Sequence, residues 1–550
     1  MALWALVAAF DIAKAVHMDD TAHLQIAQGI LARPLHPMSG IVNWEKTAQP
    51  VHTLNQPHLL FYLAAAVMWL FPLHQELALH LVWVGLSGGV VLLFFAFARR
   101  LQVSRPLGWT AAFCLGPAFL PGQNLMLDVP LAGFWLLFFF VLTGNGTTGN
   151  YSRQAGAALI SGLACLVKYS SLVLVPVGIA VSAIRRHKGT WLHLAVPLAL
   201  LAAWSLFNWY DYRGIHLLER PVLAEAPQGM VYRFLRLLVR ALLWVIAVGA
   251  VMPLSLAWVP GLLRSPAGRR GLAVCAASGA LCTLVGTFAL GPEPTLKSVL
   301  RGLFLGNGLL GMGLALATLR KGLQRRRVTQ ATWWEGAGRE ILLSLWLFGA
   351  MAFVVALSPF IAVRHVLLAL PALLGLLALG PEGAMPGSTA RRLGLAVTVV
   401  LGLGLGLSDW AFADAYRQKA KPIHAQYCRP GQRCVAFGHW GWQWYAQEAG
   451  FEVFDEAKTR LGQGDIVVVP ELLGSRAMRA SIAERSSLIS TIVIPAKAWT
   501  YLRTMSVEEN TTVQNGRSGG YYYFWTSLPW TLTRRPLERF HIYSVTQPWP

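Results

Sequence analysis

The sequence predicts an α-helical integral membrane protein with a C-terminal extracytoplasmic α/β domain. Of its 550 residues, 55% are hydrophobic and only 13% are charged, whereas a soluble domain carries about 25% charged residues. The mean hydropathy is +0.50. Apolar runs recur as far as residue 409, and the sequence turns polar and aromatic beyond Leu407. We therefore expect residues 1–409 to form a transmembrane domain and residues 410–550 to lie outside the membrane.

The basic residues indicate how the chain is oriented. A net charge of +21 would suggest a nucleic-acid partner in a soluble protein, but here Lys and Arg fall in short clusters between apolar runs. That pattern is typical of cytoplasmic loops under the positive-inside rule. The charge therefore predicts membrane lipids, with their anionic head groups, and no nucleic acid as partners.

Thirteen apolar runs approach the roughly 20 residues that a membrane-spanning helix needs. The runs are residues 1–16, 76–98, 107–121, 128–144, 155–168, 170–184, 191–208, 235–258, 272–290, 300–319, 340–357, 365–380 and 393–409. The first is short and is interrupted by Asp11 and Lys14, which suggests that the natural start lies upstream of Met1. It lacks the basic segment and cleavage site of a signal peptide.

One further apolar stretch, residues 57–72, is short and bounded by prolines. It predicts either a re-entrant or interfacial helix, or one more span. The basic clusters favour the first alternative, because they all fall on one side only if this stretch does not cross. We therefore expect thirteen crossings, a cytoplasmic N-terminus, an outside C-terminus and a first outside loop over residues 17–75.

Acidic residues gather in the outside loops of this topology. Asp19 and Asp20 follow the first apolar run, and Asp128 lies in a later short loop. Each has a structural alternative, because the first two can cap the next helix and Asp128 fits a helix cap before Pro130. The functional alternative is a shared site, in which a carboxylate acts as general base or binds a metal ion.

Cations lie at other outside corners of the predicted topology. Lys168 stands between two short apolar runs, and Arg364 and His365 precede another. A long basic side chain in such a place can simply reach the interface along its apolar stem. It can equally hold the phosphate of a lipid-linked substrate as a fixed charge.

Five segments, in this order, resemble the GT-C glycosyltransferases, in particular the branch of protein O-mannosyltransferases and the lipid A aminoarabinose transferase (glycosyltransferase family 39-like). The segments are MDDTAHLQIAQGIL, NQPHLLFYLAAAVMWLFP, NLMLDVPL, SGLACLVKYS and RHVLLALPAL. The resemblance spans about residues 1–380. Two positions depart from the family pattern, because Tyr169 replaces a glycine and His365 replaces a tyrosine.

The resemblance implies an inverting glycosyltransferase. It would move a sugar from a polyprenyl-phosphate donor to a hydroxyl acceptor on a protein, lipid A or another glycan, at the outer face of a bacterial inner membrane. Asp19 or Asp20 would activate the acceptor hydroxyl, and Asp19 matches the first acid of the family motif. Asp128 would assist, and Asp19 with Asp128 are candidate ligands for a divalent cation such as Mg²⁺ or Mn²⁺.

The donor phosphate needs a partner of opposite charge. Displacing a lipid phosphate from a sugar carbon develops negative charge on the phosphate oxygen, and preorganised cations stabilise that charge in a dry site. The resemblance assigns this role to Lys168, Arg364 and His365. Further candidate substrate contacts, with ordinary loop roles as the alternative, are His58, Tyr169, Tyr212 and Arg213.

The region after residue 409 predicts a small α/β domain. The segment RCVAFGHWGWQWYAQEAGFEVF indicates a strand, a helix and a strand, and GDIVVVP indicates a buried strand ending at Pro470. An aromatic β segment is expected from Gly519 to Trp530, near the interface. Cys428 and Cys434 predict either a small disulfide loop or two free thiols.

Two other functions remain open on the sequence. A transporter or lipid flippase would also be a polytopic membrane protein, although it would place its polar groups near the midplane on broken helices. A catalytically inactive GT-C relative that serves as an assembly subunit would carry altered motif positions such as Tyr169 and His365.

Overall fold

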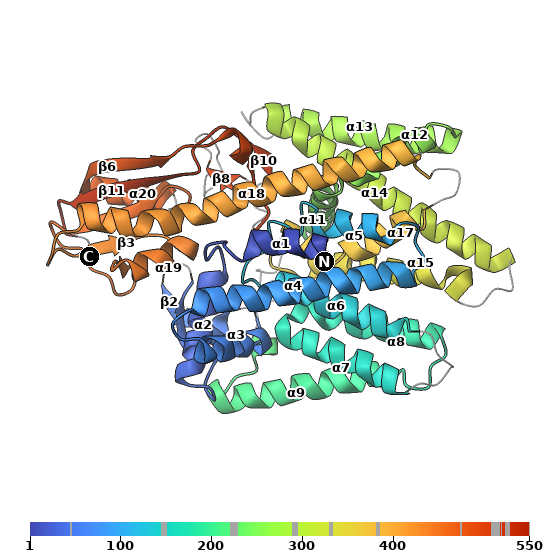
Figure 1. The fold of residues 1–550 in the computed structure, drawn as a ribbon, viewed down its shortest axis with the longest axis horizontal. Helices are drawn as coiled ribbons and strands as arrows, with labels where there is room; N and C mark the ends of the chain where they lie inside the picture. Colours follow the sequence, from blue (N-terminus) through green and yellow to red (C-terminus); the bar gives the residue numbers. More distant parts are fainter. Residues whose placement is uncertain are drawn as a thin grey trace.

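The computed structural model describes residues 1–44, 47–54, 56–144, 151–219, 229–288, 295–328, 334–380, 385–473, 476–507, 517–518, 520–522 and 528–548. Helices fill the larger part of the molecule, and a sheet-containing region lies at one end (Figure 1). The structure therefore confirms the predicted fold class, a helical membrane protein with a C-terminal sheet-containing domain.

Seven helices of the described chain are long and apolar enough to cross a membrane. They are α4 (Gln75–Arg100), α9 (Leu192–Tyr212), α11 (Met230–Val251), α13 (Pro266–Phe288), α14 (Thr295–Val328), α15 (Arg339–Ala356) and α18 (Ser388–Tyr427). Each covers one of the predicted apolar runs. Their exposed faces carry large apolar side chains such as Leu281, Leu303 and Val400, which is what lipid-facing helices require.

The other six predicted runs hold shorter helices. They are α1 (Ala2–Asp11), α5 (Pro106–Cys114), α6 (Asp128–Leu142), α7 (Tyr151–Val167), α8 (Leu174–Ile184), which follows a 3₁₀ turn at Tyr169–Val173, and α17 (Leu370–Ala378). The 15 residues of α6 extend only about 22 Å, less than the roughly 30 Å of a hydrocarbon core. Predicted site residues lie at the ends of these short helices, since Asp128 is the first residue of α6 and Lys168 follows the last residue of α7.

The predicted first outside loop folds into α2 (Asp20–Ala32), the hairpin β1 (Ile41–Asn43) and β2 (Ala48–Pro50), and α3 (Leu59–Leu70). Helix α3 lies within residues 57–72, the stretch that the basic clusters predict to be a re-entrant or interfacial helix and not a span. At 12 residues it extends about 18 Å, which is too short to cross. It packs against α2 and α4, as an interfacial helix would.

The C-terminal region contains a five-stranded sheet in the order β4-β3-β5-β11-β6. Its elements are β3 (Cys434–Ala436), α19 (Trp440–Glu448), β4 (Glu452–Val453), β5 (Ile466–Pro470), α20 (Arg476–Glu484), β6 (Ser486–Ile494) and β11 (Glu538–Val545). Strand β3 pairs in parallel with β4 and β5, while β11 is antiparallel to β5 and β6. The predicted strand–helix–strand unit and the strand ending at Pro470 are thus confirmed.

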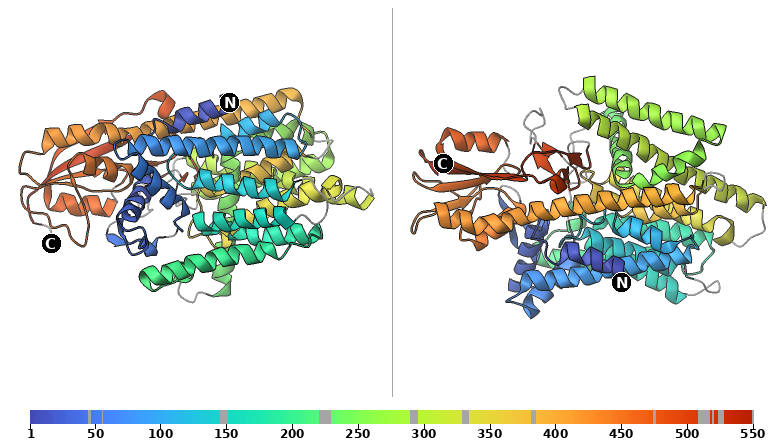
Figure 2. Two further views of the ribbon diagram at one scale, coloured as in Figure 1. Left: turned by 60° about the horizontal axis from the view of Figure 1, so that its bottom comes forward. Right: turned by 45° about the horizontal axis from the view of Figure 1, so that its top comes forward.

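The helix α18 connects the two regions and runs along both, as the orange ribbon shows in each view of Figure 2. Its 40 residues continue to Tyr427, whereas the sequence places the domain boundary at 409/410. The change in composition therefore marks a point inside a continuous helix. The reason is that the polar second half of α18 packs on α19 and on the C-terminal domain, so the helix continues after the apolar run ends.

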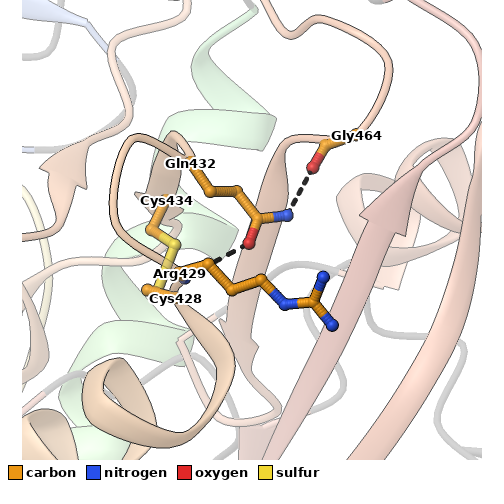
Figure 3. Close-up of a disulfide and its surroundings, with 5 residues drawn as sticks. All are labelled: Cys428, Arg429, Gln432, Cys434 and Gly464. Carbon is orange, nitrogen blue, oxygen red and sulfur yellow. Dashed lines mark hydrogen bonds between the residues drawn. A yellow bond between two sulfur atoms is a disulfide. The ribbon is translucent and has the colours of Figure 1, made fainter.

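Cys428 and Cys434 form a disulfide between the end of α18 and the start of β3 (Figure 3). The intervening turn is held by Gln432, whose side-chain Nε2 donates to the Gly464 carbonyl at 2.8 Å and whose Oε1 accepts from the Arg429 backbone N–H at 3.3 Å. Of the two alternatives for Cys428 and Cys434, the structure therefore contains the small disulfide loop.

Shorter elements complete the described chain: α10 (His216–Glu219), α12 (Val259–Leu262), α16 (Val363–Val366), β7 (Leu502–Arg503), β8 (Ser506–Val507), β9 (Arg517–Ser518) and β10 (Thr531–Leu532). The aromatic segment expected to be a strand from Gly519 to Trp530 is described only at residues 520–522 and 528–530, and neither piece is a strand. The side chains of Tyr521 and Tyr522 instead enter the core between the two regions.

Candidate active site

Four of the predicted site residues form one row of alternating charge, in which Asp19, Asp128 and Arg364 are buried and Lys168 is partly exposed. The Lys168 Nζ lies 2.9 Å from Asp128 Oδ1, and the Asp128 Oδ2 lies 3.8 Å from Arg364 Nη1. The same Arg364 nitrogen donates to Asp19 Oδ2 at 2.6 Å. The row therefore reads Lys168, Asp128, Arg364, Asp19, and we call it the charged row. It joins segments that are up to 345 residues apart in the sequence.

Each member of the charged row stands at the end of a helix. Asp19 precedes α2 and follows Met18, whose φ of 49° turns the chain sharply. Asp128 is the first residue of α6, and Lys168 follows the last residue of α7 in an extended conformation. Arg364 lies in the single turn of α16. Helix ends place polar groups beside unpaired backbone groups, and here four such ends meet.

The two carboxylates of the charged row differ in whether one of their oxygens is left without a partner. Both oxygens of Asp128 lie near a cation. Asp19 uses Oδ2 for Arg364, while its Oδ1 is buried and makes no hydrogen bond to any residue that the structure describes. A buried carboxylate oxygen without a donor is costly in a folded protein. Asp19 therefore offers a free acceptor inside the site, and Asp128 does not.

Asp20, the neighbour of Asp19, has a different environment. Its Oδ2 accepts a hydrogen bond from the His17 backbone N–H at 2.9 Å, and its Oδ1, like that of Asp19, makes no hydrogen bond within the described chain. Burial raises the pKa of this carboxyl well above its usual range, and the nearby charge of Asp19 raises it further. Asp20 thus holds the turn before α2, and no cation of the charged row contacts it in the described chain.

The corner that carries Arg364 is held from two sides. The backbone N–H groups of Val363 and Arg364 point at the carbonyls of Gly520 and Tyr521, each at 3.4 Å. On the other side, the Arg240 guanidinium of α11 donates to the carbonyls of Val354, Val355 and Ser358, just before the corner. The C-terminal domain is therefore in direct contact with the backbone of a site residue.

His365 lies beside the charged row. Its ring is buried, within electrostatic range of Lys168, Arg364 and Asp128. Its Nδ1 makes no hydrogen bond within the described part of the chain, and the ring packs against Phe360 with centroids 5.1 Å apart. His365 thus lies near Lys168 and Arg364, as the sequence predicts.

Tyr169 follows Lys168 in sequence but joins a separate network. The Trp204 indole N–H donates to the Tyr169 hydroxyl at 3.1 Å, and the hydroxyl lies 2.9 Å from His216 Nδ1. The opposite nitrogen, His216 Nε2, lies 2.6 Å from the Leu54 carbonyl. A carbonyl can only accept, so a neutral His216 carries its proton on Nε2 and accepts from Tyr169 at Nδ1. Tyr169 thus ties the end of α7 to α9 and α10.

The remaining candidate contacts lie on aromatic surfaces or on the exterior. His58 packs against Phe61 and Trp204, and burial lowers the pKa of its imidazole to about 3, so it is neutral. Tyr212 stacks on His52 with ring centroids 4.5 Å apart. Arg213 ends α9 in the left-handed region with a φ of 64° and is exposed. No contact between these three residues and the charged row is present in the described chain.

The donor set of the charged row does not fit a divalent cation. Asp19 and Asp128 were the predicted ligands, but each already faces a cationic side chain. The part of the chain that the structure describes holds no group of three or more His, Cys, Asp or Glu side chains that could coordinate a metal ion. Protein cation sites need several oxygen ligands at once, so we assign the charged row no chemistry that uses a metal ion.

Sequence reasoning missed a second buried group of charges, which we call the Lys14 cluster. The Lys14 Nζ bonds to Asp409 Oδ2 at 2.7 Å and to the Pro121 carbonyl at 2.8 Å. Asp409 also accepts from the Thr504 hydroxyl at 2.5 Å and the Tyr522 hydroxyl at 2.8 Å. The signal was available, because Lys14 interrupts an apolar run and Asp409 ends another, but nothing in the sequence pairs the two.

Together the fold and the charged row define a membrane protein with a buried, mixed-charge site built from helix ends. The fold is similar to several solved structures. ArnT from Cupriavidus metallidurans is 15% identical with a TM-score of 0.36, over 90% of this chain and 94% of that chain. The oligosaccharyltransferase AglB from Archaeoglobus fulgidus, solved with an inhibitory peptide and a dolichol-phosphate, is 12% identical with a TM-score of 0.41, over 86% and 69%.

A third similar structure is the arabinofuranosyltransferase AftD from Mycobacteria, 14% identical with a TM-score of 0.33, over 99% of this chain and 41% of that chain. All three are GT-C glycosyltransferases, the class that the sequence resembles. No family model and no curated protein sequence matches this chain. At these identities and TM-scores, the similar structures assign neither a substrate nor a residue role to it.

Proposed function

We propose that this protein is an inverting glycosyltransferase that moves a sugar from a polyprenyl-phosphate donor to a hydroxyl acceptor at the outer face of the membrane. The observation that carries the proposal is the charged row, in which Lys168, Asp128, Arg364 and Asp19 meet at buried helix ends. The reaction needs a base and phosphate-binding cations in one place, and the row supplies both.

Asp19 is the proposed general base. Its Oδ1 has no donor among the described residues, so it is available to accept the proton of an acceptor hydroxyl. Its Oδ2 is held by Arg364 at 2.6 Å, which fixes the direction of the free oxygen. Asp20 is the weaker candidate, because no cation of the charged row contacts it among the described residues and burial raises its pKa, which disfavours the ionised form that a base needs.

Lys168 and Arg364 are the proposed phosphate-binding cations. In the reaction the acceptor oxygen loses its proton to Asp19 and attacks the anomeric carbon, forming the new glycosidic bond. The bond between that carbon and the phosphate oxygen breaks, and the phosphate leaves with the electron pair. Two cations near that oxygen stabilise the developing charge in a site with little water. Asp128 lies between them and keeps them apart and oriented.

A single displacement of this kind inverts the configuration at the anomeric carbon. The donor is proposed to be lipid-linked, because the site includes the end of the short apolar helix α6, and a helix of that length would place its polar end at a membrane surface. The acceptor is a hydroxyl group of a protein, lipid A or a glycan. The disulfide between Cys428 and Cys434 supports a placement of the C-terminal domain in the periplasm of a bacterium.

The proposal is tested with purified protein in proteoliposomes that contain a panel of polyprenyl-phosphate-linked hexoses and pentoses. The readout is sugar transfer to a membrane extract, together with release of free polyprenyl phosphate. We expect transfer by the unmodified chain and its loss in Asp19→Asn and Arg364→Ala, with Glu456→Gln as the exposed control. Equal transfer by all variants, or donor movement across the bilayer without transfer, would contradict the proposal and favour a transporter.

The sugar and the acceptor are identified together by mass spectrometry of glycans and glycolipids from a deletion strain. A modification that disappears in the deletion strain returns with the unmodified gene and not with the Asp19→Asn variant. An inactive assembly subunit would behave differently, because its Asp19→Asn variant would restore the modification.

A further inference from the structure

A polar cavity lies where the membrane helices meet the C-terminal domain. Its volume is about 510 Å³. It is lined by the start of α4, by Ile12 after α1, and by side chains of α18 and α19. Its polar lining residues include Glu76, His80, Arg417, Trp444 and Glu448. None of them belongs to the charged row or to the Lys14 cluster, so the proposed glycosyl transfer leaves this cavity without a role.

The charges around the cavity are not balanced. Arg417 is compensated by Asp414, whose Oδ1 accepts from Arg417 Nη2 at 2.6 Å and from Nε at 2.9 Å. Glu76 lies 3.5 Å from Arg417 and accepts from the Tyr445 hydroxyl at 2.8 Å.

Glu448 stands at the rim, within electrostatic range of Glu76 and Lys421. Three carboxylates and two cations thus leave one negative charge in excess, and a cationic group is the complementary ligand.

His80 adds an acceptor that has no donor. Its Nδ1 lies 2.7 Å from Asp11 Oδ1, and because a carboxylate only accepts, Nδ1 carries the proton. A neutral ring then presents a lone pair on Nε2, on the opposite edge. The side chain is 1% exposed, it lines the cavity, and its Nε2 makes no hydrogen bond within the described chain. A ligand group in this cavity that brings an N–H or O–H donor to that nitrogen would satisfy it.

The acceptors and the aromatic face together fit a primary ammonium group. Such a group has three N–H donors and one positive charge. Glu76 and Glu448 supply carboxylate oxygens, and His80 supplies the lone pair. Trp444 supplies an indole ring, and cations are attracted to indole faces. A quaternary ammonium group has the charge but no N–H donor, so it leaves His80 unsatisfied.

The surroundings of the cavity indicate a membrane lipid as the source of that group. The corner between α3 and α4 exposes Trp69, Leu70, Phe71, Leu73 and Leu77, and the last two also line the cavity. Exposed apolar residues with a tryptophan beside a polar cavity are typical of the level at which lipid chains meet head groups. The apolar corner would contact the acyl chains while the head group enters the cavity.

We propose that this cavity binds the head group of an ethanolamine phospholipid, through its primary ammonium. The ammonium donates to Glu76, Glu448 and His80 and lies against the indole of Trp444. The lipid then holds the start of α4 and α19 together at the seam between the membrane helices and the C-terminal domain. This binding is separate from the proposed sugar transfer and does not depend on it.

The test is lipid retention by the full chain in detergent, measured by native mass spectrometry. The probes are dioleoyl phosphatidylethanolamine, dioleoyl phosphatidylcholine and dioleoyl phosphatidylglycerol, added singly to delipidated protein. We expect the ethanolamine lipid to bind about tenfold more tightly than the other two, because only its ammonium combines a positive charge with N–H donors for these acceptors; a factor of ten in affinity corresponds to about 1.4 kcal/mol. Glu448→Gln, at the exposed rim, should reduce that preference severalfold without affecting folding.

Glu456→Gln is the matched control, because it removes an exposed glutamate of the same domain outside the cavity. Equal retention of the three lipids would overturn the proposal, as would a preference for phosphatidylglycerol. A preference that Glu448→Gln leaves at the level of Glu456→Gln would also overturn it. No readout involves sugar transfer, so failure here and failure of the proposed enzyme are distinguished.

Discussion

The charged row and the Lys14 cluster are both groups of charge that join distant segments. They differ in whether every carboxylate oxygen has a close hydrogen-bond donor. In the Lys14 cluster, each oxygen of Asp409 has a close donor, from Lys14 and Tyr522 on one side and Thr504 on the other. In the charged row, Asp19 Oδ1 has none among the described residues. Buried polar groups in folded proteins normally find partners, so the unsaturated group is the one that stands ready for a ligand.

The two groups also differ in what they connect. The Lys14 cluster joins the segment after α1, the loop carrying Pro121, the middle of α18 and the C-terminal domain. The charged row joins only helix ends of the membrane region. A saturated ion pair at such a junction specifies how the two regions fit together, while its net contribution to stability is small until one partner is removed.

The largest expected effect separates Asp19 from Asp20. We expect Asp19→Asn to lower the turnover of sugar transfer by about 10²–10⁴-fold, because it removes the proposed general base. Asp20→Asn should cost far less, because Asp20 is not the proposed base and an amide oxygen can still accept from the His17 N–H. Steady-state kinetics in proteoliposomes compares the two. Equal losses in both variants would show that the free oxygen of Asp19 is not what drives transfer.

The next effect is on folding and belongs to the Lys14 cluster. Lys14→Met leaves Asp409 buried without its main cation, and removing one partner of a buried pair costs about 3–5 kcal/mol. Lys168→Met should cost less, because Lys168 is 17% exposed and Asp128 retains Arg364. Thermal unfolding in detergent measures both. A larger loss for Lys168→Met would reverse the distinction drawn between the two groups.

A third buried carboxyl, Glu538, extends the comparison because it forms no ion pair with any residue that the structure describes. Its oxygens accept from the Tyr416 hydroxyl at 2.6 Å and from the backbone N–H groups of Leu472 and Arg539. Burial raises its pKa from 4.5 to about 7. Between these values the folded carboxyl is protonated while the unfolded one is ionised, so folding stability falls as pH rises through this window.

For Glu538 the loss between pH 4.5 and 7 is at most about 3 kcal/mol, since one pKa unit corresponds to about 1.4 kcal/mol. Glu538→Gln should flatten this part of the stability profile and make the protein more stable than the unmodified chain above pH 7. Unfolding in detergent from pH 4.5 to 8 measures both. A variant whose profile keeps the slope of the unmodified chain would assign the pH dependence to other groups.

The smallest expected effect concerns Tyr522. Its hydroxyl lies 2.8 Å from Asp409 Oδ2 and 3.0 Å from the Pro121 carbonyl, and a single proton serves both acceptors. Tyr522→Phe should cost about 1 kcal/mol of folding stability, the net value of one hydrogen bond. Sugar transfer should change little, because the backbone contact between Tyr521 and Arg364 remains. Tyr427→Phe is the matched control. An equal loss of folding stability in that variant would show that the hydrogen bonds of the Tyr522 hydroxyl are not the cause of the loss.

Several features could be predicted from the sequence because they are local. Apolar runs of sufficient length gave α4 and α13, and the buried strand ending at Pro470 followed from IVVV next to a turn. Asp19, Asp128, Lys168 and Arg364 were predictable as candidates because charge is rare in an apolar chain and their segments resemble GT-C motifs. Their side-by-side placement remained a hypothesis until the fold brought the helix ends together.

Other features could not be predicted, for physical reasons. Asp19 and Asp20 are adjacent and chemically equivalent, and only their orientation gives one a cation and the other a backbone donor. Tyr169 follows a site residue directly, yet its ring turns to His216 and Trp204. The extent of α18 beyond its apolar run depends on the domain that packs on its second half.

The sequence by itself determined that this chain enters a membrane, where its long helices lie and which rare charges are candidates for a functional role. The reason is that the free energy of placing a side chain in water or in lipid depends on the residue type. Only the tertiary structure decided which charges are neighbours and which atom is left without a partner. Pairing depends on distances between segments hundreds of positions apart, and those distances follow from packing and not from composition.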